Sequence, residues 1–132
     1  MLLLSISFQG NCEEAINYYK DLFGAEVKVI NFLDEATEDD GIEIKADSRF
    51  VFYSEILLFG TTLMLTDGAA HKMENQNFHF TINFDTEEEM RAVFEKFADG
   101  GQVIEAPTPQ LEARLNAYVI DRFGLFWNIV FE

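Results

Sequence analysis

The chain has 132 residues and a mass of 15.2 kDa, which fits one compact domain or two small modules that share a core. Hydrophobic residues make up 48% of it and aromatic residues 14%, which excludes a chain that is mainly disordered. The 24 acidic residues outnumber the 9 basic ones and give a net charge of −15, which excludes nucleic acid as a partner.

The sequence also indicates a cellular compartment. Its single cysteine, Cys12, has no partner for an intramolecular disulfide, which suits a reducing environment. The first residues lack the basic start of a signal peptide, and no apolar run approaches the roughly 20 residues that span a bilayer. We therefore expect a cytoplasmic protein with no membrane partner.

Hydrophobic periodicity in the first half predicts a strand, a helix and then three strands. The helix is expected between Asn11, a capping residue, and Gly24, a residue type that ends helices. Acidic residues crowd the segment 34–47, which we interpret as a solvated loop. The predicted strands of this half are residues 2–8, 26–33, 50–59 and 61–66.

The same order of elements returns in the second half. Thr86 and Glu89 form a capping signal for a second helix, which Gly100 and Gly101 should close. Two prolines, at 107 and 109, are expected in the loop between the next two strands. The predicted strands are residues 78–84, 102–105, 112–121 and 125–131.

These elements form an internal repeat. The two helix caps, Asn11 and Thr86, lie 75 residues apart, and the two helix-ending glycines, Gly24 and Gly100, lie 76 apart. The fold class is therefore predicted to be α+β, with two tandem βαβββ modules whose sheets curve around a cavity, the default ligand site. The modules should span residues 1–67 and 78–132, with a linker at 68–77, and fold as one compact domain.

Two segments resemble a known superfamily. Residues 8–24 (FQGNCEEAINYYKDLFG) and residues 121–129 (DRFGLFWNI) resemble the start and the finish of PhnB-like proteins. These form a branch of the vicinal oxygen chelate superfamily, which includes glyoxalase I, bleomycin-resistance proteins and extradiol dioxygenases. The resemblance implies the paired βαβββ fold and a homodimer. It leaves function open, because such proteins range from metal enzymes to drug-sequestering binders. Asn116-Ala117 replaces a Phe-Gly pair that is usual in the branch.

The resemblance also allows the metal site of the superfamily to be tested. It assigns the metal-ligand positions to four residues, namely Leu4, Met64, His79 and Asn128. Only His79 is a good ligand for a hard or borderline divalent metal. A register shift of one residue would bring Ser5 or Ser7 inward, which would not restore metal binding. We therefore expect no metal and no cofactor. The chain also lacks a glycine-rich nucleotide loop.

The strand positions and the resemblance together define a candidate cavity. Its predicted lining consists of Leu4, Phe8, Met64, His79, Tyr118, Phe126 and Asn128. The leading interpretation is metal-independent binding of a small molecule that is partly aromatic or cationic. One alternative is an enzyme of lyase, isomerase or dioxygenase type, in which His79 is an acid–base or a lone metal ligand. Another is a ligand-free dimeric scaffold, whose cavity would be filled by side chains such as Phe126 and Met64. For His79 itself, the alternative to a functional role is a buried histidine that is hydrogen-bonded to a neighbour such as Asn128, Thr81 or Tyr118.

The sequence also allows predictions for Cys12 and Trp127. Cys12 lies in the first turn of the first helix, where the helix dipole favours a thiolate, so it is either a reactive thiol or a small filler of the cap region. Trp127 shares a strand face with Leu125 and Ile129, and we expect it beneath a helix and not in the cavity.

Overall fold

The computed structural model describes residues 2–32, 49–68, 77–111 and 113–132. The chain divides into two compact units, Met1–Lys72 and Met73–Glu132, and each is described by itself. The predicted acidic loop at 34–47 and most of the predicted linker lie outside the described residues. Neither helix in the described part of the chain has the length and apolarity to cross a membrane.

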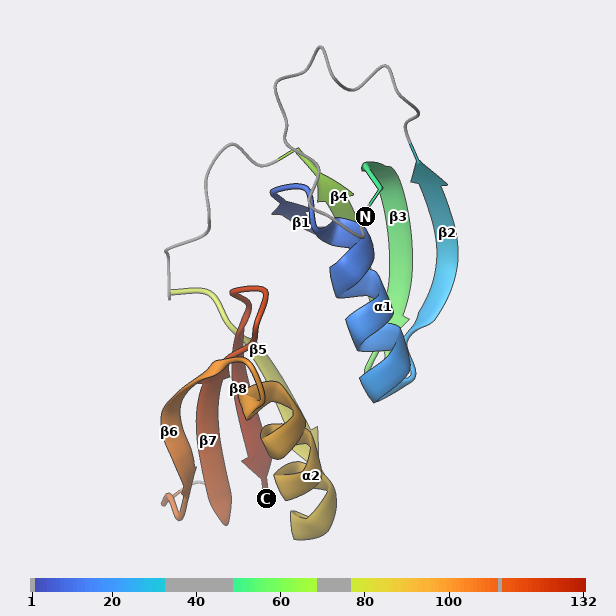
Figure 1. Cartoon of the computed structure of the whole chain (residues 1–132). Helices are drawn as coiled ribbons and strands as arrows, with labels where there is room; N and C mark the ends of the chain where they lie inside the picture. Colours follow the sequence, from blue (N-terminus) through green and yellow to red (C-terminus); the bar gives the residue numbers. More distant parts are fainter. Residues whose placement is uncertain (1, 33–48, 69–76, 112) are drawn as a thin grey trace. The chain divides into compact units, whose positions relative to one another are not determined.

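The N-terminal unit is a four-stranded sheet with one helix against it (Figure 1). Its elements in chain order are β1 (Leu4–Phe8), α1 (Cys12–Phe23), β2 (Glu26–Phe32), β3 (Val51–Leu58) and β4 (Thr61–Asp67). The strand order is β1-β4-β3-β2, in which β1 runs parallel to β4 and the other neighbours are antiparallel. This is the predicted βαβββ module.

The C-terminal unit repeats this topology (Figure 1). Its elements are β5 (Phe80–Phe84), α2 (Glu87–Ala98), β6 (Gln102–Thr108), β7 (Leu115–Ile120) and β8 (Phe126–Phe131). The strand order is β5-β8-β7-β6, again with one parallel pair, between β5 and β8. The tandem α+β repeat predicted from the sequence is therefore confirmed, as two separate four-stranded sheets.

One proline departs from the predicted boundaries. Pro107 lies inside β6, which continues to Thr108, and not in the loop that follows. The strand tolerates it because β6 is at the edge of the sheet, where one side of the backbone is unpaired. The pairing of β6 with β7 is also irregular there, with a register shift between Glu105 and Thr108.

Each helix covers one face of its own sheet. In the N-terminal unit, Ile16 and Tyr19 of α1 are buried, as are Ile6 and Leu65 on the face of the sheet that α1 covers. In the C-terminal unit, Phe97 of α2 stacks on Trp127 of β8, with ring centroids 4.5 Å apart. Trp127 is thus beneath the helix, as predicted.

The two helices begin in different ways. Thr86 accepts a hydrogen bond from the Glu89 amide at 3.2 Å, which confirms the predicted cap of α2. Asn11 occupies the N-cap position of α1, but its side chain makes no capping hydrogen bond, so that predicted role is wrong. The acceptor is instead Asp67, at the end of β4, whose Oδ1 accepts from the Cys12 amide at 3.0 Å.

Asp67 joins three parts of the N-terminal unit. Its Oδ1 also accepts from the Gly10 amide at 2.9 Å, and its Oδ2 accepts from the Val51 amide at 2.9 Å. The carboxylate is buried, and hydrogen bonds to backbone amides offset the loss of its hydration. It therefore holds the β1–α1 turn and the start of β3 against the end of β4.

Asp121 has a similar role in the C-terminal unit, and its hydrogen bonds account for the segment 121–129 that resembles the end of PhnB-like proteins. Its Oδ1 accepts from the amides of Phe123 and Leu125, at 2.9 and 3.1 Å, and its Oδ2 accepts from Trp127 Nε1 at 2.9 Å. The aspartate, the turn and the tryptophan of that motif are thus one hydrogen-bonded unit. The motif is a structural device that closes the β7–β8 turn.

Candidate functional site

The face of the C-terminal sheet that α2 does not cover is called the open face below. Because side chains alternate along a strand, the burial of Trp127 beneath α2 places Phe126 and Asn128 on the opposite side. The register then assigns neighbouring residues to the same side, since Asn128 is paired with both Thr81 and Tyr118. The strand residues of the open face are Thr81, Asn83, Gln102, Glu105, Thr108, Asn116, Tyr118, Ile120, Phe126, Asn128 and Val130.

Three aromatic rings contact one another on the open face. His79, just before β5, meets Tyr118 of β7 edge-to-face at 5.8 Å between centroids and Phe126 of β8 at 5.4 Å. Tyr118 and Phe126 are themselves 5.7 Å apart. His79 is exposed and the other two rings are partly exposed, so the cluster presents aromatic surface to solvent. Such surface suits the stacking of a planar ligand.

Next to these rings lies a short chain of polar side chains. Asn128 Nδ2 donates to Asn116 Oδ1 at 2.8 Å and to the Ala117 carbonyl at 3.0 Å. Thr81 Oγ1 lies 3.4 Å from Asn128 Oδ1 and donates to it. Asn128 is buried and its amide nitrogen has both protons in use, so it is a fixed part of the floor.

Four of the seven predicted cavity residues come together here, namely His79, Tyr118, Phe126 and Asn128. The other three belong to the N-terminal unit and do not share one face. Met64 pairs with Ser5 on the face away from α1, whereas Leu4 and Phe8 have the side-chain direction of buried Ile6, toward α1. The register in the structure is therefore shifted by one residue from the predicted one, and it places Ser5, not Leu4, on the face away from α1.

The corresponding face of the N-terminal sheet has a different chemistry. Ser7 and Thr66 lie side by side, with hydroxyl oxygens 3.5 Å apart, and Lys28 Nζ donates to Thr62 Oγ1 at 2.9 Å. Tyr53 of β3 is also partly exposed, and burial together with the Glu55 carboxylate raises its pKa. This face therefore combines hydroxyl groups and a tyrosine beside a carboxylate.

The predicted cavity lining does not include Glu105, Thr81 and Asn116, which lie on the open face. Thr81 and Asn116 could have been found by following the alternation of β5 and β7 away from Trp127. Glu105 could not, because an irregularity between Val103 and Glu105 resets the alternation of β6. Glu105 nevertheless pairs with Tyr118 and also accepts from Gln110 Nε2 at 3.2 Å.

The surroundings of Cys12 distinguish between its two predicted roles. Cys12 is fully buried, and burial, together with the nearby Asp67 and Glu13 carboxylates, raises the pKa of its thiol. Of the two, the structure favours the filler of the cap region.

Within the described parts of the chain, no three His, Cys, Asp or Glu side chains gather closely enough to hold a metal ion.

Comparisons with known proteins agree with this architecture. The chain is 26% identical to protein YjdN of Escherichia coli over 132 residues, which cover 94% of this chain and 90% of YjdN. A Bacillus cereus structure described as a 3-demethylubiquinone-9 3-methyltransferase, PhnB protein, is similar with a TM-score of 0.84 at 23% identity, covering 99% of this chain and 98% of that one.

A more distant structure has the same fold. The fosfomycin resistance protein FosX of Listeria monocytogenes gives a TM-score of 0.67 at 11% identity, covering 100% of this chain and 92% of FosX. One FosX variant was solved with Mn(II) and a dihydroxypropylphosphonic acid.

At the level of sequence, the model of the family described as 3-demethylubiquinone-9 3-methyltransferase matches residues 2–130. Because this match covers nearly the whole chain, the chain belongs to that family, and its tandem βαβββ units share the fold of the PhnB and FosX structures.

Proposed function

We propose that the open face binds a small organic molecule with an aromatic group, and that it does so without a tightly held metal ion. The observation that carries the proposal is the cluster of His79, Tyr118 and Phe126, whose rings contact one another on a face that the helix leaves uncovered. A planar group can stack on these rings, while Thr81 and Asn128 beside them offer polar contacts that would orient it.

The donor set does not fit the metal chemistry of the superfamily. At the positions implied by the resemblance, Leu4 has no donor atom and Met64 offers a soft thioether. The Asn128 amide is already engaged with Asn116, Ala117 and Thr81, which leaves His79 as the one strong ligand. The proposed binding therefore needs no metal ion.

Methyl transfer, which the family's description names, is not part of the proposal. The sequence has no glycine-rich loop of the kind that cradles a nucleotide cofactor. Both helix N-termini in the described residues already have carboxylates nearby, from Asp67 at α1 and from Glu87 and Glu88 in the first turn of α2. These ends disfavour the anionic groups that helix N-termini otherwise bind.

An enzyme that uses His79 as an acid or base is the second candidate. His79 is exposed, and among the described residues its imidazole makes ring contacts but no hydrogen bond, so its nitrogens are free to meet a substrate there. This differs from the buried, hydrogen-bonded histidine considered from the sequence. If a substrate is found, His79→Ala should abolish turnover in the enzyme but only weaken binding in a binding protein.

Native mass spectrometry of the purified protein, with metal analysis of the same sample, tests the leading proposal. We expect a metal-free protein, in the dimeric state proposed from the superfamily, and a co-purified organic mass that Tyr118→Ala removes. One stoichiometric divalent ion per chain would contradict the proposal. Ser7→Ala is the matched control because Ser7 lies on the corresponding face of the other unit and should leave the organic mass in place.

A further inference from the structure

Among its described strand positions, the open face carries one carboxylate, that of Glu105, beside its aromatic rings. Glu105 of β6 is the cross-strand partner of Tyr118, which itself contacts His79 and Phe126. Cross-strand partners on one face have Cβ atoms only about 5 Å apart, so the Glu105 carboxylate lies next to the ring cluster. Its Oε1 accepts from Gln110 Nε2 at 3.2 Å, a neutral contact that orients the carboxylate without neutralising it.

No lysine or arginine occupies a strand position of the open face. Residues 73–132 contain 11 acidic but only 4 basic side chains, and the structure places each base elsewhere. Arg91 and Lys96 lie on α2, Arg122 donates to the Asp99 carbonyl at 3.0 Å, and Arg114 lies over the Phe131 ring. The Glu105 charge therefore has no cationic partner among the described residues of this face.

From this arrangement we infer that the open face selects an aromatic cation, with Glu105 as its counter-charge and the His79, Tyr118 and Phe126 rings as its stacking surface. The inference rests on the proposed function, because it names the class of molecule bound at the same site. Aromatic faces attract cations through their quadrupole, and a nearby carboxylate adds to that attraction. The net charge of −15 favours the approach of cations over longer distances.

The test uses three bicyclic probes of similar size that differ in charge. These are the cation N-methylquinolinium, the neutral 1-methylnaphthalene and the anion 1-naphthoate, each titrated into the full chain and followed by the amide NMR signals of Tyr118 and Asn128. Cation–π attraction and a partly exposed ion pair together correspond to about tenfold tighter binding of the cation than of the neutral probe. The anion should bind most weakly. Salt at about 1 M should reduce the preference for the cation.

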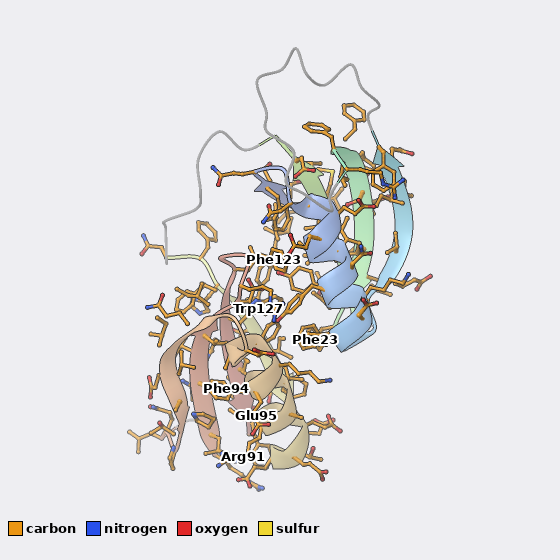
Figure 2. The ribbon with its side chains drawn as sticks, in the orientation of Figure 1. Phe23, Arg91, Phe94, Glu95, Phe123 and Trp127 are labelled. Atoms are coloured by element: carbon orange, nitrogen blue, oxygen red, sulfur yellow. The ribbon has the colours of Figure 1, made fainter. Side chains whose placement is uncertain are left out.

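Glu105→Gln should reduce the preference for the cation to the part that the rings alone supply, and leave the affinity for the neutral probe unchanged. The matched control is Glu95→Gln, which removes the same charge from α2, on the helix side of the sheet (Figure 2). If these charges act only through the net charge of the protein, both variants will bind the cation more weakly by the same factor. That result would refute the role of Glu105.

The outcomes distinguish the two proposals. Equal affinity of the wild-type protein for all three probes would refute the selection of cations, while it would support an aromatic site on the open face. Absence of binding by all three would refute the proposed function and this inference together. A preference for the cation that is as large in Glu105→Gln as in the wild type would assign the selection to the rings alone and refute the role of Glu105 as counter-charge.

Discussion

Replacing Asp121 by asparagine should destabilise the C-terminal unit through a defined set of hydrogen bonds. The wild-type carboxylate is 3% exposed and accepts from two backbone amides and from Trp127 Nε1. The amide of Asp121→Asn keeps one oxygen, so its NH₂ group must face at least one of these three donors. One buried N–H group is then left without an acceptor.

The size of the effect follows from these contacts. An unsatisfied buried donor costs about 1 to 3 kcal/mol. The remaining bonds lose their charge assistance, which roughly halves their strength, while the lower cost of burying a neutral group offsets part of that loss. We therefore expect the free energy of unfolding to fall by about 2 to 4 kcal/mol.

Urea unfolding can measure this loss with two independent signals, far-ultraviolet circular dichroism and the fluorescence of Trp127, the single tryptophan. Asp99→Asn is the matched control, because the Asp99 side chain is exposed and its ion pair with Arg122 is long, at 3.9 Å. The control should stay within about 0.5 kcal/mol of the wild type. A loss below about 0.5 kcal/mol in Asp121→Asn would refute the reasoning, because it would mean that water replaces the carboxylate.

Three other predictions test other parts of the chain. Cys12 should not react with a thiol reagent such as DTNB in the folded protein, because burial raises the pKa of its thiol and blocks access to it. It should react after unfolding in urea, and fast reaction of the native protein would contradict this prediction. The Arg49 guanidinium holds the pKa of Glu13 below its ordinary value of 4.5, so Glu13 stabilises the fold at neutral pH and less as pH falls through its folded pKa. Glu13→Gln should thus lower the melting temperature at pH 7 but not at pH 2, and an equal loss at both would exclude the ion pair. Gly101→Ala should destabilise the protein more than Gly60→Ala. The Gly101 Cβ would overlap backbone carbonyl oxygens of α2 and β7, whereas a Cβ at Gly60, which has a φ of +81°, meets open space and costs only backbone strain. Melting temperatures compare the two variants, and equal losses would contradict the packing argument.

Local patterns in the sequence predict much of this fold. The capping residue Thr86 and the position of Trp127 depend on neighbours within a few residues or on strand alternation, and both predictions are confirmed. The cap of α1 could not be found this way. Asn11 has the right chemistry, but the acceptor is Asp67, which lies 55 residues from the Cys12 amide that it binds. Only the parallel pairing of β1 with β4 brings the two together.

Strand alternation in the sequence also predicts part of the candidate site. The alternation of β8 correctly separates Trp127 from Phe126 and Asn128. The sequence of β1 alternates strictly, with Leu4, Ile6 and Phe8 on one face and the two serines on the other. The prediction that Leu4 and Phe8 line the cavity depended instead on the resemblance, which assigns Leu4 to a metal-ligand position, and the structure follows the alternation. Glu105 was hidden by a bulge, which no alternating pattern reveals.

The three hydrogen bonds of Asp67 also bear on how the N-terminal unit folds. The carboxylate can lose its water only when the turn before α1 and the start of β3 have both reached the end of β4, since its partners Gly10 and Val51 lie 57 and 16 residues away along the chain. We therefore expect its burial to come late and cooperatively in folding, when β1 pairs with β4. The amides of Gly10, Cys12 and Val51 would then exchange with deuterium at one common rate, that of opening the whole unit, although they belong to different elements.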